Sequence, residues 1–148
     1  MKANRLFIAC VSALSLAACG GGTDLAAVLS GAAEKPSAVT TTGSGNSDVT
    51  VSDKKLEVSG NFKDLSGNAM SAHIHGPADA NSTGPIFCTL TVPAATSGSI
   101  SGGEGAGSCS TIELTDALVT QFEQGMFYVN IHTAANPNGE IRGQLIKK

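Results

Sequence analysis

Short runs of alternating apolar and polar residues dominate the chain from about residue 25 onward. Val49 and Val51, and after a turn Leu56 and Val58, show the two-residue period of strands with one buried face. Gly, Ser, Asn and Asp separate these runs, as turns require. The pattern predicts strands at residues 25–33, 46–52, 55–63, 70–76, 86–92, 97–102, 106–113, 126–133 and 140–146.

The order of these elements predicts an all-β fold. Strands joined by close turns, without helices between them, are typical of an antiparallel sandwich or barrel and not of a parallel sheet. We expect a Greek-key β-sandwich, similar to immunoglobulin-like domains or superoxide dismutase, formed by one domain over residues 25–148. One short helix precedes the last two strands, with Thr115 as its N-cap and Gly125 at its end.

Alternation in the last two strands also predicts how they pair. A slip of one residue would place an arginine on the core face, so one register is favoured. That register pairs Ile131 with Ile141, His132 with Glu140, Asn130 with Arg142, and Tyr128 with Gln144.

The three histidines of the chain fall on two of the predicted strands. His73 and His75 share one strand face and Ile74 takes the other, so the histidines belong to the polar side. If the strand of His132 lies beside them, three imidazoles and the Glu140 carboxylate converge. Such a set can hold Zn²⁺ or Cu²⁺, because neutral imidazole suits both metals.

Two other interpretations of this polar face remain open. Asn130 and Arg142 belong to the same predicted cluster, and Glu140 and Arg142 can form an ordinary ion pair on an exposed sheet face. The cluster would then be a structural hydrogen-bond network. Alternatively, its polar groups contact a small ligand or a carbohydrate.

The first eighteen residues have the pattern of a secretion signal. Lys2 and Arg5 precede an apolar run over residues 6–14, which is too short to span a bilayer. The sequence Leu16-Ala17-Ala18-Cys19 resembles the lipobox of bacterial lipoproteins.

That resemblance implies cleavage of residues 1–18 and lipidation of Cys19. Two or more acyl chains would anchor the protein stably to a membrane, whereas one chain binds only marginally. Residues 19–24 would then form a flexible tether. Gly20 after the cysteine favours the outer membrane of a Gram-negative cell envelope.

Cys88 and Cys109 remain after the leader and the lipid site are set aside. In an oxidising compartment such a pair favours a disulfide, which would close a loop of about 20 residues. Two thiolate metal ligands are the alternative, although no Cys-x-x-Cys spacing supports it.

Composition excludes several classes of function. The chain has 148 residues, a net charge of −3 and no basic stripe, so nucleic-acid binding is not expected. A hydrophobic content of 41% is too high for a disordered chain. No Gly-x-Ser-x-Gly nucleophile elbow occurs, and no phosphate-binding loop, so we expect no enzyme.

Several motifs together resemble one known family. They are Leu29-Ser30-Gly31-Ala32-Ala33-Glu34-Lys35-Pro36, Ala72-His73-Ile74-His75-Gly76-Pro77-Ala78, Tyr128-Val129-Asn130-Ile131-His132-Thr133 and Gly139-Glu140-Ile141-Arg142-Gly143-Gln144-Leu145. From about residue 25 to 146 the chain resembles the CHRD domain, the module repeated in chordin and common in bacterial secreted proteins. The opening departs slightly, with Ala33 and Lys35 where the family often has Asn and Val.

The resemblance implies an antiparallel β-sandwich, and it implies no particular activity. Two functions follow as hypotheses. The first is a non-enzymatic module, anchored in the cell envelope, that binds a protein or a glycan. The second is a copper- or zinc-binding protein that uses His73, His75, His132 and Glu140.

Overall fold

A computed structural model describes residues 22–102 and 107–148. The predicted leader and Cys19 lie outside this part of the chain. Nine strands, two 3₁₀-helices and one α-helix occur within it. Their bounds are β1 (Thr23–Ser30), η1 (Gly31–Ala33), β2 (Ser44–Ser52), β3 (Lys55–Lys63), β4 (Ala69–His75), β5 (Ile86–Leu90), β6 (Gly98–Gly102), η2 (Cys109–Thr111), α1 (Asp116–Glu123), β7 (Tyr128–Thr133), β8 (Ile141–Gln144) and β9 (Ile146–Lys147).

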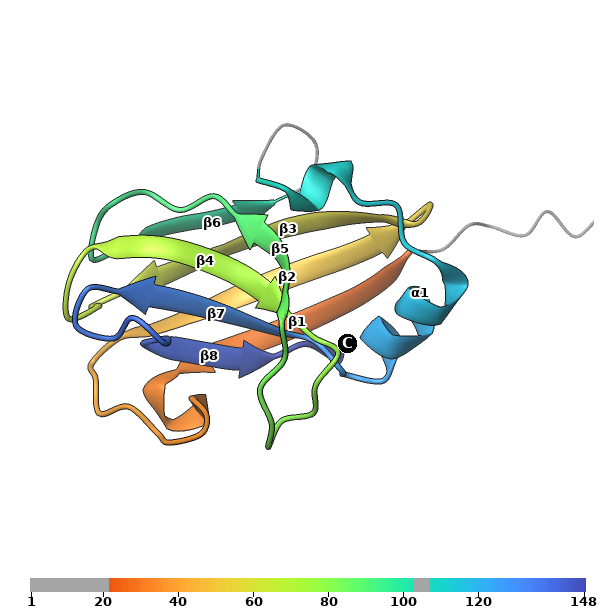
Figure 1. Cartoon of the computed structure of the whole chain (residues 1–148). Helices are drawn as coiled ribbons and strands as arrows, with labels where there is room; N and C mark the ends of the chain where they lie inside the picture. The colour runs from red at the N-terminus through yellow and green to blue at the C-terminus, as the bar shows by residue number, and fades with distance from the viewer. Residues whose placement is uncertain (1–21, 103–106) are drawn as a thin grey trace, which may run out of the picture.

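The strands form one antiparallel sheet in the order β5-β4-β7-β8-β1-β2-β3-β6, and β9 pairs with β1 (Figure 1). Its two edges, β5 and β6, approach each other at a bridge between Thr91 and Ser101, whose two N–O distances are 2.8 and 3.0 Å. The sheet is therefore nearly closed and barrel-like. The prediction of an antiparallel all-β fold is confirmed, whereas the Greek-key sandwich layout is not.

The alternating residues around position 53 form a hairpin of β2 and β3, as their pattern indicates. Val49 pairs with Val58, and Val51 pairs with Leu56, so all four side chains point into the core. Its two-residue turn, Asp53-Lys54, has φ values of 49° and 62°. Two residues in the left-handed region are what a turn needs to match the twist of the flanking strands.

The inward positions of the strands fill the interior of the sheet. Together with residues of α1 and the loops, they supply the large apolar side chains that have almost no exposed surface: Leu25, Leu29, Leu56, Ile74, Ile100, Leu114, Phe122, Phe127, Ile131, Ile141 and Leu145. Burial of such side chains supplies most of the stability of a domain of this size. The histidines, Asn130 and Arg142, discussed below, come from the outward positions of the same strands.

Helix α1 lies at one end of the sheet (Figure 1) and begins and ends where predicted. The Thr115 hydroxyl accepts a hydrogen bond from the Leu118 amide, and Gly125 follows the helix with φ of 71°. Phe122 stacks on Phe127, with ring centroids 3.8 Å apart, and so fixes the helix to the core. No helix within residues 22–102 and 107–148 is long and apolar enough to cross a membrane.

The strand predicted at residues 106–113 is wrong for the residues that the structure describes. Residues 109–111 form η2, and Gly107 has φ of 69°. The segment is held across β5 by hydrogen bonds between Ser108 and Thr89 and by the predicted disulfide between Cys88 and Cys109.

Several strand boundaries also differ from the prediction; residues 31–33, for example, were expected in the first strand but form η1. Thr23 and Asp24 were expected in the tether, but they pair with Val51 and Thr50 and begin β1. The last strand is interrupted at Leu145, whose amide donates to the Phe127 carbonyl at 2.9 Å. The interruption lets the chain leave β7 and continue along β1 as β9.

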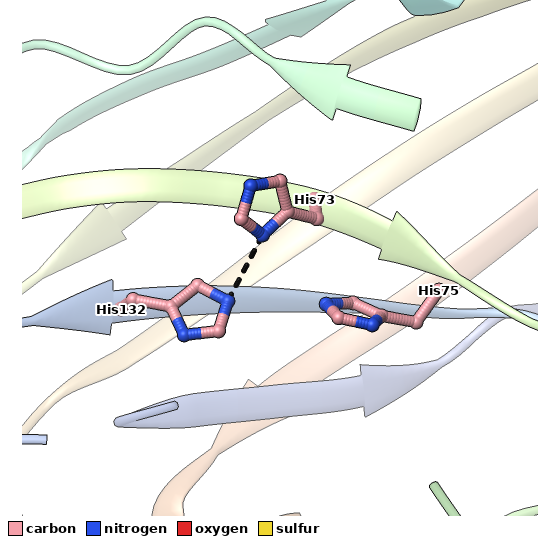
Figure 2. Close-up of side chains that lie close together, drawn as sticks. All are labelled: His73, His75 and His132. Carbon is pink, nitrogen blue, oxygen red and sulfur yellow. Dashed lines mark hydrogen bonds between the residues drawn. The ribbon is translucent and has the colours of Figure 1, made fainter. Parts of the chain in front are cut away.

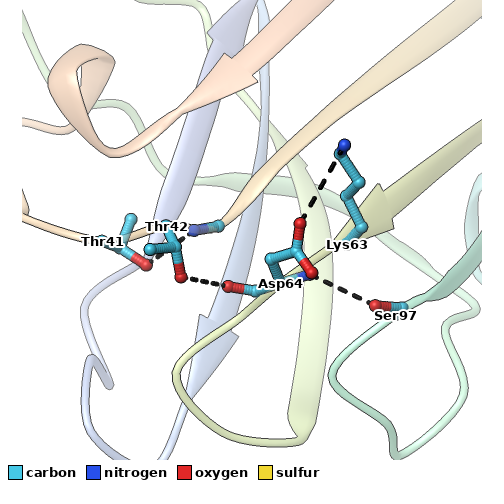
Figure 3. Close-up of polar contacts among 6 residues, drawn as sticks. Thr41, Thr42, Lys63, Asp64 and Ser97 are labelled. Carbon is cyan, nitrogen blue, oxygen red and sulfur yellow. Dashed lines mark hydrogen bonds and ion pairs between the residues drawn. The ribbon is translucent and has the colours of Figure 1, made fainter.

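Three connecting loops lie at the end of the sheet opposite α1 (Figure 1), and Figure 3 shows the polar contacts between them. The Thr42 hydroxyl donates to the Asp64 carbonyl at 2.9 Å, and the Asp64 amide donates to the Ser97 hydroxyl at 3.2 Å. Asp64 adopts φ of 57°, and its carboxylate lies 4.0 Å from the Lys63 ammonium. Side chains thus connect the loops before β2, after β3 and before β6.

The disulfide is expected to stabilise the domain measurably. It joins residues 21 apart, which corresponds to about 3 kcal/mol when the constraint acts on the unfolded chain. Reduction should lower the free energy of unfolding by about that amount in urea denaturation. In the Cys88→Ala/Cys109→Ala variant the reductant should have no effect, and an equal effect there would contradict this assignment.

Candidate functional site

Strands β4 and β7 bring the three histidines together. They are antiparallel neighbours in which His73 pairs with Asn130, and Ser71 pairs with His132. Ile74 points into the core and is fully buried, so the histidines on either side of it point outward. The sequence left open whether the two histidine strands are adjacent, and the pairing of β4 with β7 shows that they are.

The imidazoles approach to hydrogen-bond distance. His73 Nδ1 lies 3.0 Å from His132 Nε2 (Figure 2), and one nitrogen from each of the three rings lies within 4.8 Å of the others. All three side chains are half-buried. Among the described residues, this is the group of ionisable side chains whose geometry can hold a metal ion.

Backbone carbonyls orient two of the rings. His75 Nδ1 lies 3.1 Å from the Gly84 carbonyl oxygen, and His132 Nδ1 lies 3.0 Å from that of Pro137. A carbonyl only accepts, so both Nδ1 atoms carry the proton and both Nε2 atoms present a lone pair. His73 Nδ1–H then donates to His132 Nε2. In metal sites, a backbone carbonyl commonly accepts a hydrogen bond from the histidine nitrogen that does not bind the metal.

The environment keeps the imidazoles neutral. Burial, together with the neighbouring His132 and His75, lowers the pKa of His73 to about 4. Burial also lowers the pKa of His75 and of His132, although each gains a carbonyl partner that acts in the opposite direction. A metal ion therefore meets little competition from protons at neutral pH, since only neutral imidazole binds it.

The predicted polar cluster continues from the histidines across β7 to β8. Asn130 pairs with Arg142 and Tyr128 pairs with Gln144, as expected from the alternation. His75 stacks on Tyr128 with centroids 4.9 Å apart, and the Arg142 guanidinium carbon lies 3.6 Å from the centre of the same ring. Tyr128 thus connects the histidines to the arginine.

The part of this face around Asn130 and Arg142 is buried. Asn130 and Arg142 are each 2% exposed, because the loops after η1 and after β4 cover them. The Arg142 guanidinium donates to the Asp79 carbonyl at 3.1 Å and to the Gln144 side chain at 3.2 Å. The exposed ion pair between Glu140 and Arg142, considered from the sequence, is not formed.

Glu34 belongs to this cluster, although sequence reasoning assigned it no role. Glu34 is 3% exposed, and its carboxylate accepts a hydrogen bond from Asn130 Nδ2 at 2.7 Å. Burial raises its pKa to about 7, against the opposing effect of Arg142. The sequence offered one signal of a role for Glu34: it is a charged residue directly after three small residues, Gly31-Ala32-Ala33.

Glu140 does not join the histidines. Its carboxylate accepts hydrogen bonds from Thr41 at 2.6 Å, from the amide and hydroxyl of Ser66 at 2.7 Å each, and from Thr133 at 2.6 Å. It precedes β8 in the bend after Gly139, whose φ is 132°, so strand alternation does not apply to it.

The carboxylate of Glu140 instead connects loops at one end of the sheet. Burial alone would raise its pKa, but the hydrogen bonds from Thr133, Thr41 and Ser66 outweigh that effect and lower it to about 2. Glu140 therefore remains ionised over the physiological range and stabilises the loops that carry its donors.

Comparison with known proteins supplies the family. A model of the CHRD domain matches residues 25–145. The chain belongs to the CHRD-domain family. No curated protein and no solved structure matches it. In this CHRD domain the matched region contains the whole candidate site, from Glu34 to Arg142.

The buried Glu34 should make stability depend on pH. Its pKa is raised to about 7 from 4.5, so folding favours its protonated form, and stability is lost as pH rises between these values. The Glu34→Gln variant should lack this loss, which is on the order of 3 kcal/mol. Urea denaturation at about pH 5 and about pH 8 measures it. Equal pH dependence in both proteins would contradict the prediction.

Proposed function

We propose that this CHRD domain binds one Zn²⁺ or Cu²⁺ ion through His73 Nδ1, His75 Nε2 and His132 Nε2. The observation that carries the proposal is the pair of Nδ1–H contacts to the Gly84 and Pro137 carbonyls. They direct two Nε2 lone pairs toward the third ring.

The donor set fits such an ion. Nitrogen ligands bind Zn²⁺ at about 2.0–2.1 Å, so nitrogens within 4.8 Å of one another need only small ring rotations to share it. His73 must then give up its hydrogen bond to His132 and carry its proton on Nε2. Three imidazoles leave a fourth position for water or another ligand. Glu140 is not needed for this set.

The module itself is proposed to be non-enzymatic and held in the cell envelope. The lipobox-like sequence Leu16-Ala17-Ala18-Cys19 supports a lipid anchor, with the outer membrane as its location. A partner in the envelope would be a protein or a glycan. Metal binding on a rigid pair of strands suits a binding or structural role. Such a metal site does not require a two-sheet Greek-key fold like that of superoxide dismutase.

Metal content tests the site directly. Purified protein, loaded with Zn²⁺ or Cu²⁺ and desalted, should retain about one ion per chain. His75→Gln and His132→Gln should each remove most of it, because two imidazoles bind far more weakly than three. Cu²⁺ should also quench the fluorescence of Tyr128, since the chain has one Tyr and no Trp and this ring stacks on His75.

Glu140→Gln is the matched control for these variants. It removes a buried charge from the same sheet without touching the three imidazoles, so the folded variant should keep its metal. Loss of metal in Glu140→Gln, with retention in the folded His75→Gln variant, would refute the proposed ligand set.

Membrane attachment is tested separately. The Cys19→Ala variant should move from the membrane fraction to the soluble or secreted fraction, because no thiol remains for lipidation. Cell fractionation with detection of the protein measures this. Unchanged membrane association would remove the lipid anchor from the proposal and leave the metal site unaffected.

A further inference from the structure

A pocket of about 260 Å³ lies beside the histidines on the outer face of the sheet. Its inner wall contains Glu34, Tyr128, Asn130 and Arg142, all of which are buried. Exposed residues of the two covering loops, among them Thr83, form its rim. The pocket thus connects solvent with the most polar part of the interior.

Unsatisfied buried atoms gather at this pocket. Within residues 22–102 and 107–148, three buried side-chain atoms have no hydrogen-bond partner: His75 Nε2, Asn130 Oδ1 and Arg142 Nη1. All three residues line the pocket. Such atoms are few in folded proteins, and each costs about 1–3 kcal/mol, so their concentration in one place requires an explanation. His75 Nε2 faces the proposed metal, which leaves one acceptor and one charged donor.

We propose that this pocket binds a small hydroxycarboxylate. Its carboxylate accepts a hydrogen bond from Arg142 Nη1, and its hydroxyl donates to Asn130 Oδ1. The ligand thereby supplies hydrogen-bond partners for both Arg142 Nη1 and Asn130 Oδ1.

The charge of the pocket favours an anion. The four ion pairs within the described residues all involve lysines, and none involves Arg142. The guanidinium contacts neutral acceptors, the Asp79 carbonyl and the Gln144 amide. A buried charge without a counter-ion is costly, and a bound carboxylate removes that cost.

Glu34 does not cancel this preference. It binds Asn130 and not the arginine, and burial shifts it toward its neutral form. Lys35 adds a second cation at the rim. Arg142 and Lys35 together outweigh the partly protonated Glu34 carboxylate, so the pocket lining has a net positive charge.

The size of the pocket limits the ligand to a few heavy atoms or one sugar ring, since pockets for larger ligands are about 300–1,000 Å³. Two sources share the required chemistry: a free hydroxy acid, and the acidic sugar of an envelope glycan. Glycolate and glucuronate represent them.

Fluorescence of Tyr128 gives a direct readout. The chain has one Tyr and no Trp, and Arg142 lies 3.6 Å from this ring, so titration with glycolate should change its emission. We expect saturation with a Kd on the order of 1 mM or below. The titration uses protein from which metal has been removed. Neither Arg142 nor Asn130 is a proposed metal ligand, so the result does not depend on whether the histidines bind metal.

Comparison of ligands identifies the contacts. Acetate lacks the hydroxyl that Asn130 would accept from, so it should bind at least about tenfold more weakly than glycolate. Equal binding of acetate and glycolate would overturn the assignment of Asn130.

Chloride is the control for ionic strength. At the same ionic strength it should leave the Tyr128 emission unchanged, and an emission change similar to that with glycolate would overturn the site. Tighter binding of glucuronate than of glycolate identifies the acidic sugar, and the reverse identifies the free acid.

Variants locate the site. Arg142→Lys should weaken glycolate binding at least about tenfold, because lysine cannot reproduce the planar guanidinium. Lys63→Met, which removes an exposed cation on β3, should bind as the unchanged protein does. If Arg142→Lys does not fold, NMR of the unchanged protein decides: glycolate should shift the side-chain signals of Arg142 and Asn130. No saturable response, or shifts elsewhere only, would overturn the proposal.

Discussion

The site depends on the alternation of β4 and β7 within a nearly closed sheet. Because Ile74, Val129 and Ile131 fill the interior and are fully buried, the residues between them must face outward. The antiparallel register of the two strands then places His73 opposite Asn130 and brings His132 to the same region. A shift of one residue would bury the imidazoles in the core and expose the isoleucines. The packing that stabilises the fold and the geometry of the histidines therefore have the same cause.

Two loops convert this outward face into an interior. The loop after β4 supplies the Gly84 and Asp79 carbonyls, and the loop after η1 supplies Glu34. Their cover removes water, which lowers the pKa of the histidines and raises that of Glu34. The strands fix the positions of the imidazoles, and the loops set their protonation states. Such a division is common in binding sites, because strands position side chains more precisely than loops do.

Tyr128 connects the two parts of the face. It lies between β4 and β8 in the sheet, with His75 stacked on its ring and Arg142 close to the same ring. The same ring lines the pocket beside the histidines. Gly76 contributes to this arrangement, since its φ of 148° turns the chain away from β4, and a Cβ there would lie 2.5 Å from Phe127.

Periodicity predicted those features that depend on strands. The hairpin turn at Asp53, the register of Asn130 with Arg142 and the outward histidines all follow from a two-residue period. Glu140 was misplaced because it stands in a bend, where the positive φ of Gly139 changes the direction of the next side chain. The burial of Glu34 was also out of reach, since it depends on how a loop folds over a sheet formed by distant residues.

The remaining polar groups argue that this face is more than scaffold. For stability alone, apolar residues of similar volume in place of a buried charge are often neutral or favourable. Yet Arg142, Asn130 and Glu34 are all buried here, and two of them keep an atom without a partner. The same chain satisfies the equally buried Glu140 with four hydrogen bonds. The chain thus satisfies one buried carboxylate fully, whereas its unsatisfied groups belong to residues that line a pocket.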